Sequence, residues 1–456
     1  MDAALSIADS SLNAERTAIA VTAENVANAS TPGYVRETAT VNALPGDTTG
    51  VGDGVAVTSV TQATNTLLSA NNYQAQGALS NLTSAQQLLT AIENVFPLGQ
   101  GTSGSTSTST NTSIAGQLST FWSDWDDINA DPTAPAPRSE VIQSAQGIVE
   151  SLNEASTQLS QIGTNASAEL ANQVGSVNTL LTQAAQLNQS ILTVSTGGGD
   201  PAQLQDQMNA VLGQLSSFAG VTVRLQSNGT SNVGIGGVNV VAGDRASTLS
   251  VTNTTGTTAI LASPGGIATP VSSGSIAGLL SGINQYLPQY QADLDSVANN
   301  LTTTVNTQLA AGYTASGTSG AAEPLFVGSG AQNIALNPTV VADPTLIAAA
   351  ASTGAAAAND GSNAQAMAEL GSSPTGPDRA YQNLIQSVGS ATQSLTAQVG
   401  AQTSVANQAQ AALSASSGVD LDTELTNLMS YQQNYQASAH MLTTINQTMQ
   451  SLISAI

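Results

Sequence analysis

Cysteine and lysine are absent from this chain, and aromatic residues are scarce. Without cysteine the protein can form no disulfide, no thiolate metal site and no thiol nucleophile. Aromatic residues make up 3% of the 456 residues, so any core must be built from Ala, Leu, Ile and Val. The 29 acidic residues outnumber six arginines and give a net charge of −23. Such a surface repels phosphate backbones and anionic lipid, which disfavours nucleic acid and membranes as partners.

Segments that direct a chain into or across a membrane are also missing. The N-terminus lacks the basic region and apolar stretch of a secretory signal peptide. No run approaches the roughly 18 consecutive apolar residues of a transmembrane helix. We therefore expect a cytoplasmic protein, or one exported by a route that needs no cleaved signal.

No combination of residues indicates catalysis. The single histidine, His440, excludes an H-E-x-x-H zinc motif. Gly197–Gly199 precede a helix, but no P-loop lysine follows, which favours a loop and helix cap over a phosphate site. Four aspartates lack the spacing of a calcium loop and indicate a solvated acidic helix end: Asp124, Asp126, Asp127 and Asp131. We expect no enzyme activity, no metal and no cofactor.

What the chain does have is an apolar residue at every seventh position near both ends. The C-terminal ladder comprises Leu421, Leu428, Tyr435, Leu442, Met449 and Ile456, with Leu425 beside it. The N-terminal ladder comprises Leu5, Leu12, Ile19 and Val26, with Ala8 and Thr22 between its rungs and Glu15 as a polar exception. A seven-residue repeat keeps one seam on one side of a helix, which then needs a partner helix. We predict that the two ends pair and form an assembly interface.

Burial of these ladders stabilises the ends by less than the ordering of their backbone costs. We therefore expect both ends to need neighbouring subunits to become rigid. Tyr431 and Tyr435, next to Gln432 and Gln433, also indicate an interface.

Between the ends the periodicity predicts long helices and one β region. Pro32–Gly33 suits a type II turn, and strands are expected at 35–41 and 54–60. Short alternating stretches punctuated by glycine predict strands over 220–270, and 313–376 reads as irregular. Helices are expected at 2–28, 63–96, 114–129, 138–196 (one helix or two abutting ones), 201–219, 275–309, 382–414 and 421–456.

The predicted fold class is mainly α with a small β insertion. Residues 1–45 and 416–456 are expected to form a terminal coiled-coil domain. Residues 46–220 and 268–415 are expected to form a rod of long helices, and 221–267 a compact all-β outer domain.

Both ends resemble the rod, hook and hook-associated proteins that form the axis of the bacterial flagellum. Residues 25–36 read N-V-A-N-A-S-T-P-G-Y-V-R, similar to the N-terminal motif of that family, and 418–429 are similar to its C-terminal motif. Residues 431–439 are most similar to the hook-associated members, as are 121–138, 311–313 and 337–344, although Asp131 stands where the family usually has Asn. The motif residues singled out are Asn25, Asn28, Thr31, Pro32, Gly33, Tyr34, Gln432 and Gln433.

The resemblance implies a secreted structural subunit of the extracellular flagellum. It would leave unfolded through the flagellar type III export channel and assemble with copies of itself into a ring between hook and filament. Its implied partners are the hook protein, a second hook-associated junction protein and a cytoplasmic export chaperone at the C-terminal region.

Other readings remain open at this point. The second junction protein, a hook or distal rod subunit, or a filament subunit shares parts of these motifs. The long helices at 63–96 and 138–196 argue against hook and rod proteins, and the Pro-Gly motif argues against a filament subunit. A secreted hydrolase on a flagellar scaffold lacks its zinc motif here, and a coiled-coil adhesin would show a repeated stalk.

Overall fold

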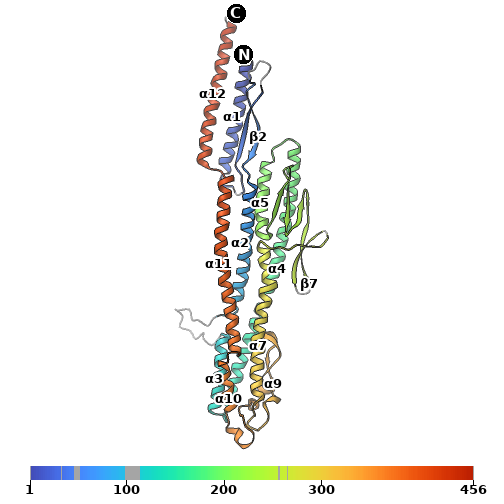
Figure 1. The fold of residues 1–456 in the computed structure, drawn as a ribbon, viewed down its shortest axis with the longest axis vertical. Coiled ribbons are helices and arrows are strands. Elements are labelled where there is room, and N and C mark those ends of the chain that lie inside the picture. The colour runs from blue at the N-terminus through green and yellow to red at the C-terminus, as the bar shows by residue number, and fades with distance from the viewer. Residues whose placement is uncertain are drawn as a thin grey trace.

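The computed structural model describes residues 2–31, 33–45, 52–97, 113–254, 257–263 and 265–454. They form an elongated molecule with both termini at the same end (Figure 1). The mainly helical class predicted from the sequence is confirmed.

The terminal end consists of two helices and a hairpin. Helix α1 (Asp2–Asn28) runs beside α12 (Leu421–Ser454), and the antiparallel strands β1 (Glu37–Ala43) and β2 (Val55–Gln62) pack on α1 (Figure 1). The hairpin register shifts between Thr40 and Val41. Strand β1 begins two residues later than the 35–41 strand predicted from the sequence.

Long helices form the middle of the molecule. Helices α2 (Thr66–Glu93) and α11 (Pro377–Ser417) lie together, and α4 (Pro135–Thr196) packs against α5 (Ala202–Ala219). Helix α4 is one continuous helix, which decides between the two readings of the sequence. It begins three residues earlier than expected because prolines are tolerated in a first helical turn.

The expected helix over 275–309 is interrupted once. Helix α6 (Ser275–Ser281) passes through a π-helical turn (Gly282–Tyr286) into α7 (Leu287–Ala310). The side chain of Asn284 in that turn holds the backbone of Thr258 by two hydrogen bonds of 2.9 Å. The local widening thus coincides with a contact to the β region.

The end opposite the termini is closed by short elements around α3 (Ile114–Ala130). They are β10 (Phe326–Val327), α8 (Gly330–Asn333), β11 (Ala335–Leu336), α9 (Pro338–Ala342), α10 (Ser362–Glu369) and 3₁₀ turns at 320–322, 344–346, 354–359 and 370–372. Phe121 contacts Trp125 and Phe326 in the core here, with ring centroids about 6 Å apart. Arg138 is buried and donates to the carbonyls of Ile347 (2.6 Å) and Pro132 (3.1 Å).

The β region contains two small antiparallel sheets. One comprises β3 (Thr222–Leu225), β4 (Ser231–Ile235), β5 (Val238–Ala242) and β6 (Arg245–Ala246) in that order. The other comprises β7 (Thr248–Thr254), β8 (Thr257–Ser263) and β9 (Ile267–Ala268). We call residues 221–267 the β module.

The β module packs directly onto α4. Asn188 donates to the carbonyls of Ser231 and Gly243 at 2.8 Å, and Asn178 donates to the carbonyl of Leu249 at 2.9 Å. Val233 and Val241 are fully buried in a core that is continuous with the rod. The inner face of the β module therefore shares the α4 core, and the division into a separate outer domain stays a prediction.

The chain enters and leaves the β module at one place. Gly220 has a φ of +58°, and a Cβ there would collide with Ser273. The amide of Gly274 donates to the carbonyl of Gly77 on α2 at 2.8 Å. Pro264, which the sequence suggested as part of the far boundary, lies outside the described residues.

Candidate assembly site at the chain termini

The seam between α1 and α12 is lined by small and polar residues. Helix α1 buries Ala8, Ala14, Ala18, Val21, Thr22 and Asn25. Helix α12 buries only Glu424 and Ser438 among its described residues. The hydroxyls of Ser11 and Ser438 lie 2.9 Å apart. Small side chains allow the two backbones to approach closely, and hydrogen bonds cross the seam.

The larger rungs of the predicted apolar ladders are half-buried or exposed at this seam, whereas Ala8 and Thr22, between the N-terminal rungs, are buried. Leu5 is 37% exposed, Leu421 and Leu425 are each 47% exposed, and Tyr435 is 40% exposed. Six rungs are half-buried, namely Leu12, Ile19, Val26, Leu428, Leu442 and Met449, and Ile456 lies outside the described residues. The closest approach follows the small residues of α1, which turns the bulkier ladder towards the edge of the pair.

Glu15, the polar exception in the N-terminal ladder, faces α12. One of its carboxylate oxygens is buried without a hydrogen-bond partner. Burial raises the pKa of Glu15, and a hydrogen bond with Asn434 opposes that shift. An unsatisfied carboxylate makes this pairing weaker than an apolar seam.

Asn25 is the centre of a hydrogen-bonded cluster where α1 ends. Its side-chain oxygen accepts from the amide of Glu37 and the hydroxyl of Tyr34, both at 2.9 Å. Its amide nitrogen donates to the carbonyl of Glu37 at 2.8 Å and to a carboxylate oxygen of Glu424 at 3.2 Å. Asn25 is 1% exposed, so water cannot replace these bonds.

An ion pair ties the two termini together at the same point. The Nε of Arg36 lies 2.6 Å from a carboxylate oxygen of Glu424, which is buried. Among the described residues it is the sole ion pair. The Arg36 amide donates to the carbonyl of Ser417 at 2.9 Å, where α11 ends. We call Asn25, Tyr34, Arg36, Glu37 and Glu424 the elbow cluster.

The turn after α1 positions Tyr34 and Arg36. The amide of Tyr34 donates to the carbonyl of Thr31 at 3.2 Å, and Gly33 has a φ of +84°, as a type II turn requires. A Cβ on Gly33 would lie 3.5 Å from that of Ala210, so the turn rests on α5. Asn28 and Thr31 bond each other at the surface, and Pro32 lies outside the described residues.

Carboxylates gather where the elbow cluster meets α5. Burial, reinforced by the charges of Glu24, Asp200 and Asp206, raises the pKa of Glu37 to about 7. Burial also raises the pKa of Asp206 to about 6, against hydrogen bonds from the Val35 backbone and the Gln62 side chain. This connection between the terminal helices and the rod therefore changes charge near neutral pH.

Three family models match the chain. The model "Flagellar hook-associated protein FlgK helical domain" matches residues 104–326. "Flagella basal body rod protein" matches residues 5–34, and "Flagellar basal body rod FlgEFG protein C-terminal" matches residues 409–455. The two helices that meet at the elbow cluster, α1 and α12, therefore both match models of flagellar axial proteins.

Similar proteins agree with these models. Flagellar hook-associated protein 1 of Escherichia coli (strain K12) is 28% identical over 336 residues, covering 70% of this chain and 59% of that protein. Flagellar hook-associated protein 1 of Bacillus subtilis (strain 168) is 25% identical over an alignment of 510 positions, covering 99% of this chain and 98% of that protein. The chain is similar to flagellar hook-associated protein 1 along nearly its whole length.

A solved structure shares the fold of this chain. The flagellar hook junction protein FlgK from Burkholderia pseudomallei has a TM-score of 0.61 and 17% identity, covering 75% of this chain and 99% of that one. The chain spans about 59% of the length of the enterobacterial hook-associated relatives it matches. Among its described residues, no helix combines the length and apolar character needed to cross a membrane.

The sequence singled out only part of the elbow cluster. Asn25 and Tyr34 were chosen and do meet, whereas Gln432 and Gln433 are exposed on α12. Arg36 and Glu424 were read as parts of the motifs but not as a pair, since 388 positions separate them. Glu424 precedes Tyr431 and Ser438 by one and two seven-residue steps, which was the available signal.

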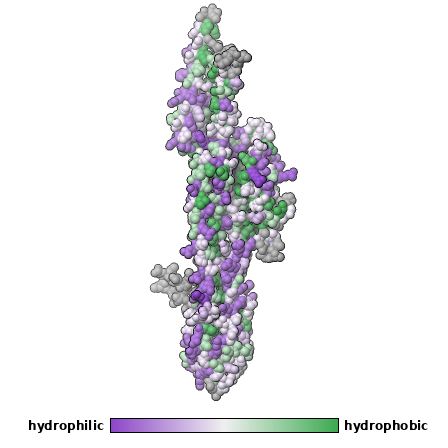
Figure 2. Space-filling view, viewed as in Figure 1, coloured by the Kyte–Doolittle hydropathy of each residue, from purple (hydrophilic) through white to green (hydrophobic). Residues whose placement is uncertain are grey.

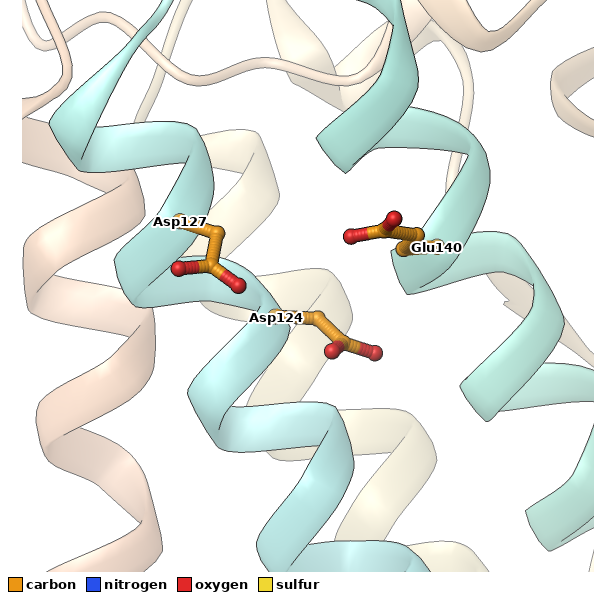
Figure 3. A group of neighbouring side chains, drawn as sticks. All are labelled: Asp124, Asp127 and Glu140. Atoms are coloured by element: carbon orange, nitrogen blue, oxygen red, sulfur yellow. The ribbon is translucent and has the colours of Figure 1, made fainter.

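Three carboxylates converge near the end of the molecule opposite the termini (Figure 3). Oxygens of Asp124, Asp127 and Glu140 all lie within 4.8 Å of one another. Burial raises the pKa of Asp124, against a hydrogen bond with Ser144. Asp127 and Glu140 are exposed, and exposed acidic groups are common without an ion. We assign no metal to this group.

Proposed function

We propose that the chain is a structural, non-enzymatic subunit of the bacterial flagellum that joins hook to filament. The observation that carries this proposal is the elbow cluster, in which residues of the two axial-protein motifs bind each other. A helical middle matched by the hook-associated model favours the junction over a hook or rod. The second junction protein and other axial subunits remain the alternatives, because the terminal models are shared with rod proteins.

Assembly with other copies is supported by apolar side chains that the paired ends leave uncovered. The exposed large apolar side chains on α12 are Leu421, Leu425, Met429, Tyr435, Met441, Leu452 and Ile453. Leu421, Leu425 and Met429 follow one another at four-residue spacing and form an apolar stripe along one side of the helix, and an exposed apolar patch of this kind marks an interaction site. We propose that neighbouring axial subunits cover it, and that α1 and α12 complete a coiled-coil domain (1–45 and 416–456) in the assembly.

The remaining expectations belong to the same proposal. The helical rod (46–220 and 268–415) would space the terminal domain from an outer all-β domain at 221–267. The chain would be exported without a cleaved signal and act outside the cell. A cytoplasmic chaperone would cover the α12 stripe before export, and the hook protein and second junction protein would be its neighbours.

Electron microscopy of flagella from a deletion strain tests this function. We expect normal hooks without filaments and filament protein in the culture medium, with both defects reversed by the intact chain. Missing hooks would instead identify a rod or hook subunit. Normal filaments in the deletion strain would contradict any role at the junction.

A further inference from the structure

The β module has the opposite charge balance from the rest of the molecule. It contains two of the six arginines, Arg224 and Arg245, and one of the 29 acidic residues, Asp244. Both arginines are exposed, and neither forms an ion pair within the described residues. Of the four exposed arginines outside any ion pair in the described residues, the β module carries two, whereas Arg16 and Arg379 lie singly on α1 and α11. In Figure 2, strongly hydrophilic residues lie along the side of the body at the level of this module.

Strand register places both arginines on the same face of the four-stranded sheet. Val223, Val233, Val241 and Ala246 are cross-strand partners, and the fully buried Val233 and Val241 mark their face as the inner one. Successive residues alternate between faces. Arg224, Asn232, Ala242 and Arg245 therefore lie across the outer face.

This row, which we call the basic row, has a defined width. It crosses three strand spacings of about 4.8 Å, which separates the two arginine backbones by about 14 Å. Asn232 and Ala242 between them are short, so a partner can approach both guanidinium groups at once. Two fixed charges on a flat sheet favour a flat or ridged acidic surface over a single small anion.

The chain itself supplies such an acidic surface. Helix α4 exposes Glu140, Glu150, Glu154 and Glu169, and its sole arginine, Arg138, is buried at the helix start. Glu150 and Glu154 are one helical turn apart and thus neighbours on the helix surface. We call these four glutamates the acidic strip. Copies with a net charge of −23 repel one another, and contact between unlike surfaces reduces that repulsion.

We propose that the basic row of one copy docks on the acidic strip of a second copy, as a lateral contact within the ring. The two surfaces differ, so the contact is heterologous and can repeat from copy to copy around a closed ring. This inference rests on the proposed function, because it requires copies to stand side by side. It adds a contact made by the middle of the chain to those made by the terminal helices.

Static light scattering of the purified full-length chain tests the contact through the second virial coefficient. We expect attraction in roughly 0.02 M NaCl that disappears in roughly 0.5 M NaCl, where charges are screened within a few ångströms. Arg224→Glu/Arg245→Glu should abolish the attraction, and so should Glu150→Arg/Glu154→Arg. Mixing these two variants should restore it, because each reversed surface then meets a complementary one.

A matched control separates the site from net charge. Arg379 is exposed on α11, so Arg379→Glu changes the charge by the same amount as Arg224→Glu. We expect the self-association constant to fall about two- to fivefold for Arg224→Glu and to change little for Arg379→Glu. Equal effects of these two variants, no rescue on mixing, or a wild-type chain without salt-dependent attraction would each overturn the proposal. None of these results would affect the deletion-strain test of the junction role.

Discussion

At the scale of single residues, one buried amide connects both ends of the chain. Asn25 satisfies the backbone of Glu37, the hydroxyl of Tyr34 and a carboxylate of Glu424 at once. A carboxylate or a shorter side chain in its place could not both donate and accept in this arrangement. The motif residue therefore has a physical reason: it holds the turn, the first strand and the last helix in one position.

Replacement of Asn25 tests that role. Asn25→Ala should cost about 1–3 kcal/mol locally, because it leaves buried polar groups without partners. Hydrogen exchange should accelerate at the amides of Arg36 and Glu37 while α4 keeps its protection. Asn28→Ala, at the surface of the same helix, is the control and should change little. Equal exchange in both variants would remove Asn25 from the centre of the cluster.

The carboxylates beside the cluster predict a dependence on pH. The pKa of Glu37 rises from 4.5 to about 7 on folding, and that of Asp206 from 3.8 to about 6. The folded state therefore binds more protons, so stability of the elbow should fall as pH rises from about 4.5 to about 7. Thermal melts of Glu37→Gln should be less pH-dependent in this window than those of the wild type. Glu150→Gln, at an exposed site, should behave like the wild type.

At the scale of elements, helix existence was predictable but the choice of seam was not. Periodicity, Gly and Pro located the long helices and the β region because those signals are local. The seven-residue ladders predicted that α1 and α12 pair, yet the only N-terminal ladder positions that are buried are Ala8 and Thr22, between the larger rungs. Which face of a helix meets its partner depends on how closely two backbones approach, and a partner 388 residues away supplies that information.

We predict that the ladder forms contacts between copies. Leu428→Asp or Leu442→Asp should abolish assembly while the rod stays folded, because an unpaired charge in a water-excluding contact costs several kcal/mol. Electron microscopy of complemented deletion cells would reveal bare hooks, and circular dichroism would retain the main melting transition. The control is Gln432→Asp, at an exposed polar position. Normal filaments with Leu428→Asp would show that the ladder lies outside the interface.

The terminal helices should be the least protected elements of a dilute monomer. Residues 1–40 and 418–456 bury few apolar side chains, whereas α4 buries many. Hydrogen exchange of the monomer should therefore be fast in both ends and slow in α4, and assembly should slow exchange in the ends. Protection of the ends equal to that of α4 would contradict the idea that neighbours order them.

At the scale of the whole molecule, the β module shares a hydrophobic core with the rod, although the chain enters and leaves the module at one place. Deleting residues 222–263 with a short Gly/Ser bridge should lower the melting temperature, because it uncovers apolar surface of α4 such as Ile191, which lies beneath Gly229. Export and axial polymerisation should persist, since both depend on the ends, and filaments should shear off more readily. If cells that carry the chain lacking residues 222–263 have filaments as resistant to shear as wild-type filaments, the β module makes no contact that strengthens the junction.

The pairing of Arg36 with Glu424 has a consequence for when the terminal end can fold. The two residues come from opposite ends of the polypeptide, so a chain threaded end-first through a narrow passage delivers the second partner only after nearly everything between has passed. When the N-terminal end emerges first, Arg36 has no ion-pair partner until Glu424 follows. Any copy lacking α12 would keep that arginine unpaired and Asn25 short of an acceptor. If the chain is exported end-first, the elbow cluster can therefore form only after both ends of the subunit have emerged.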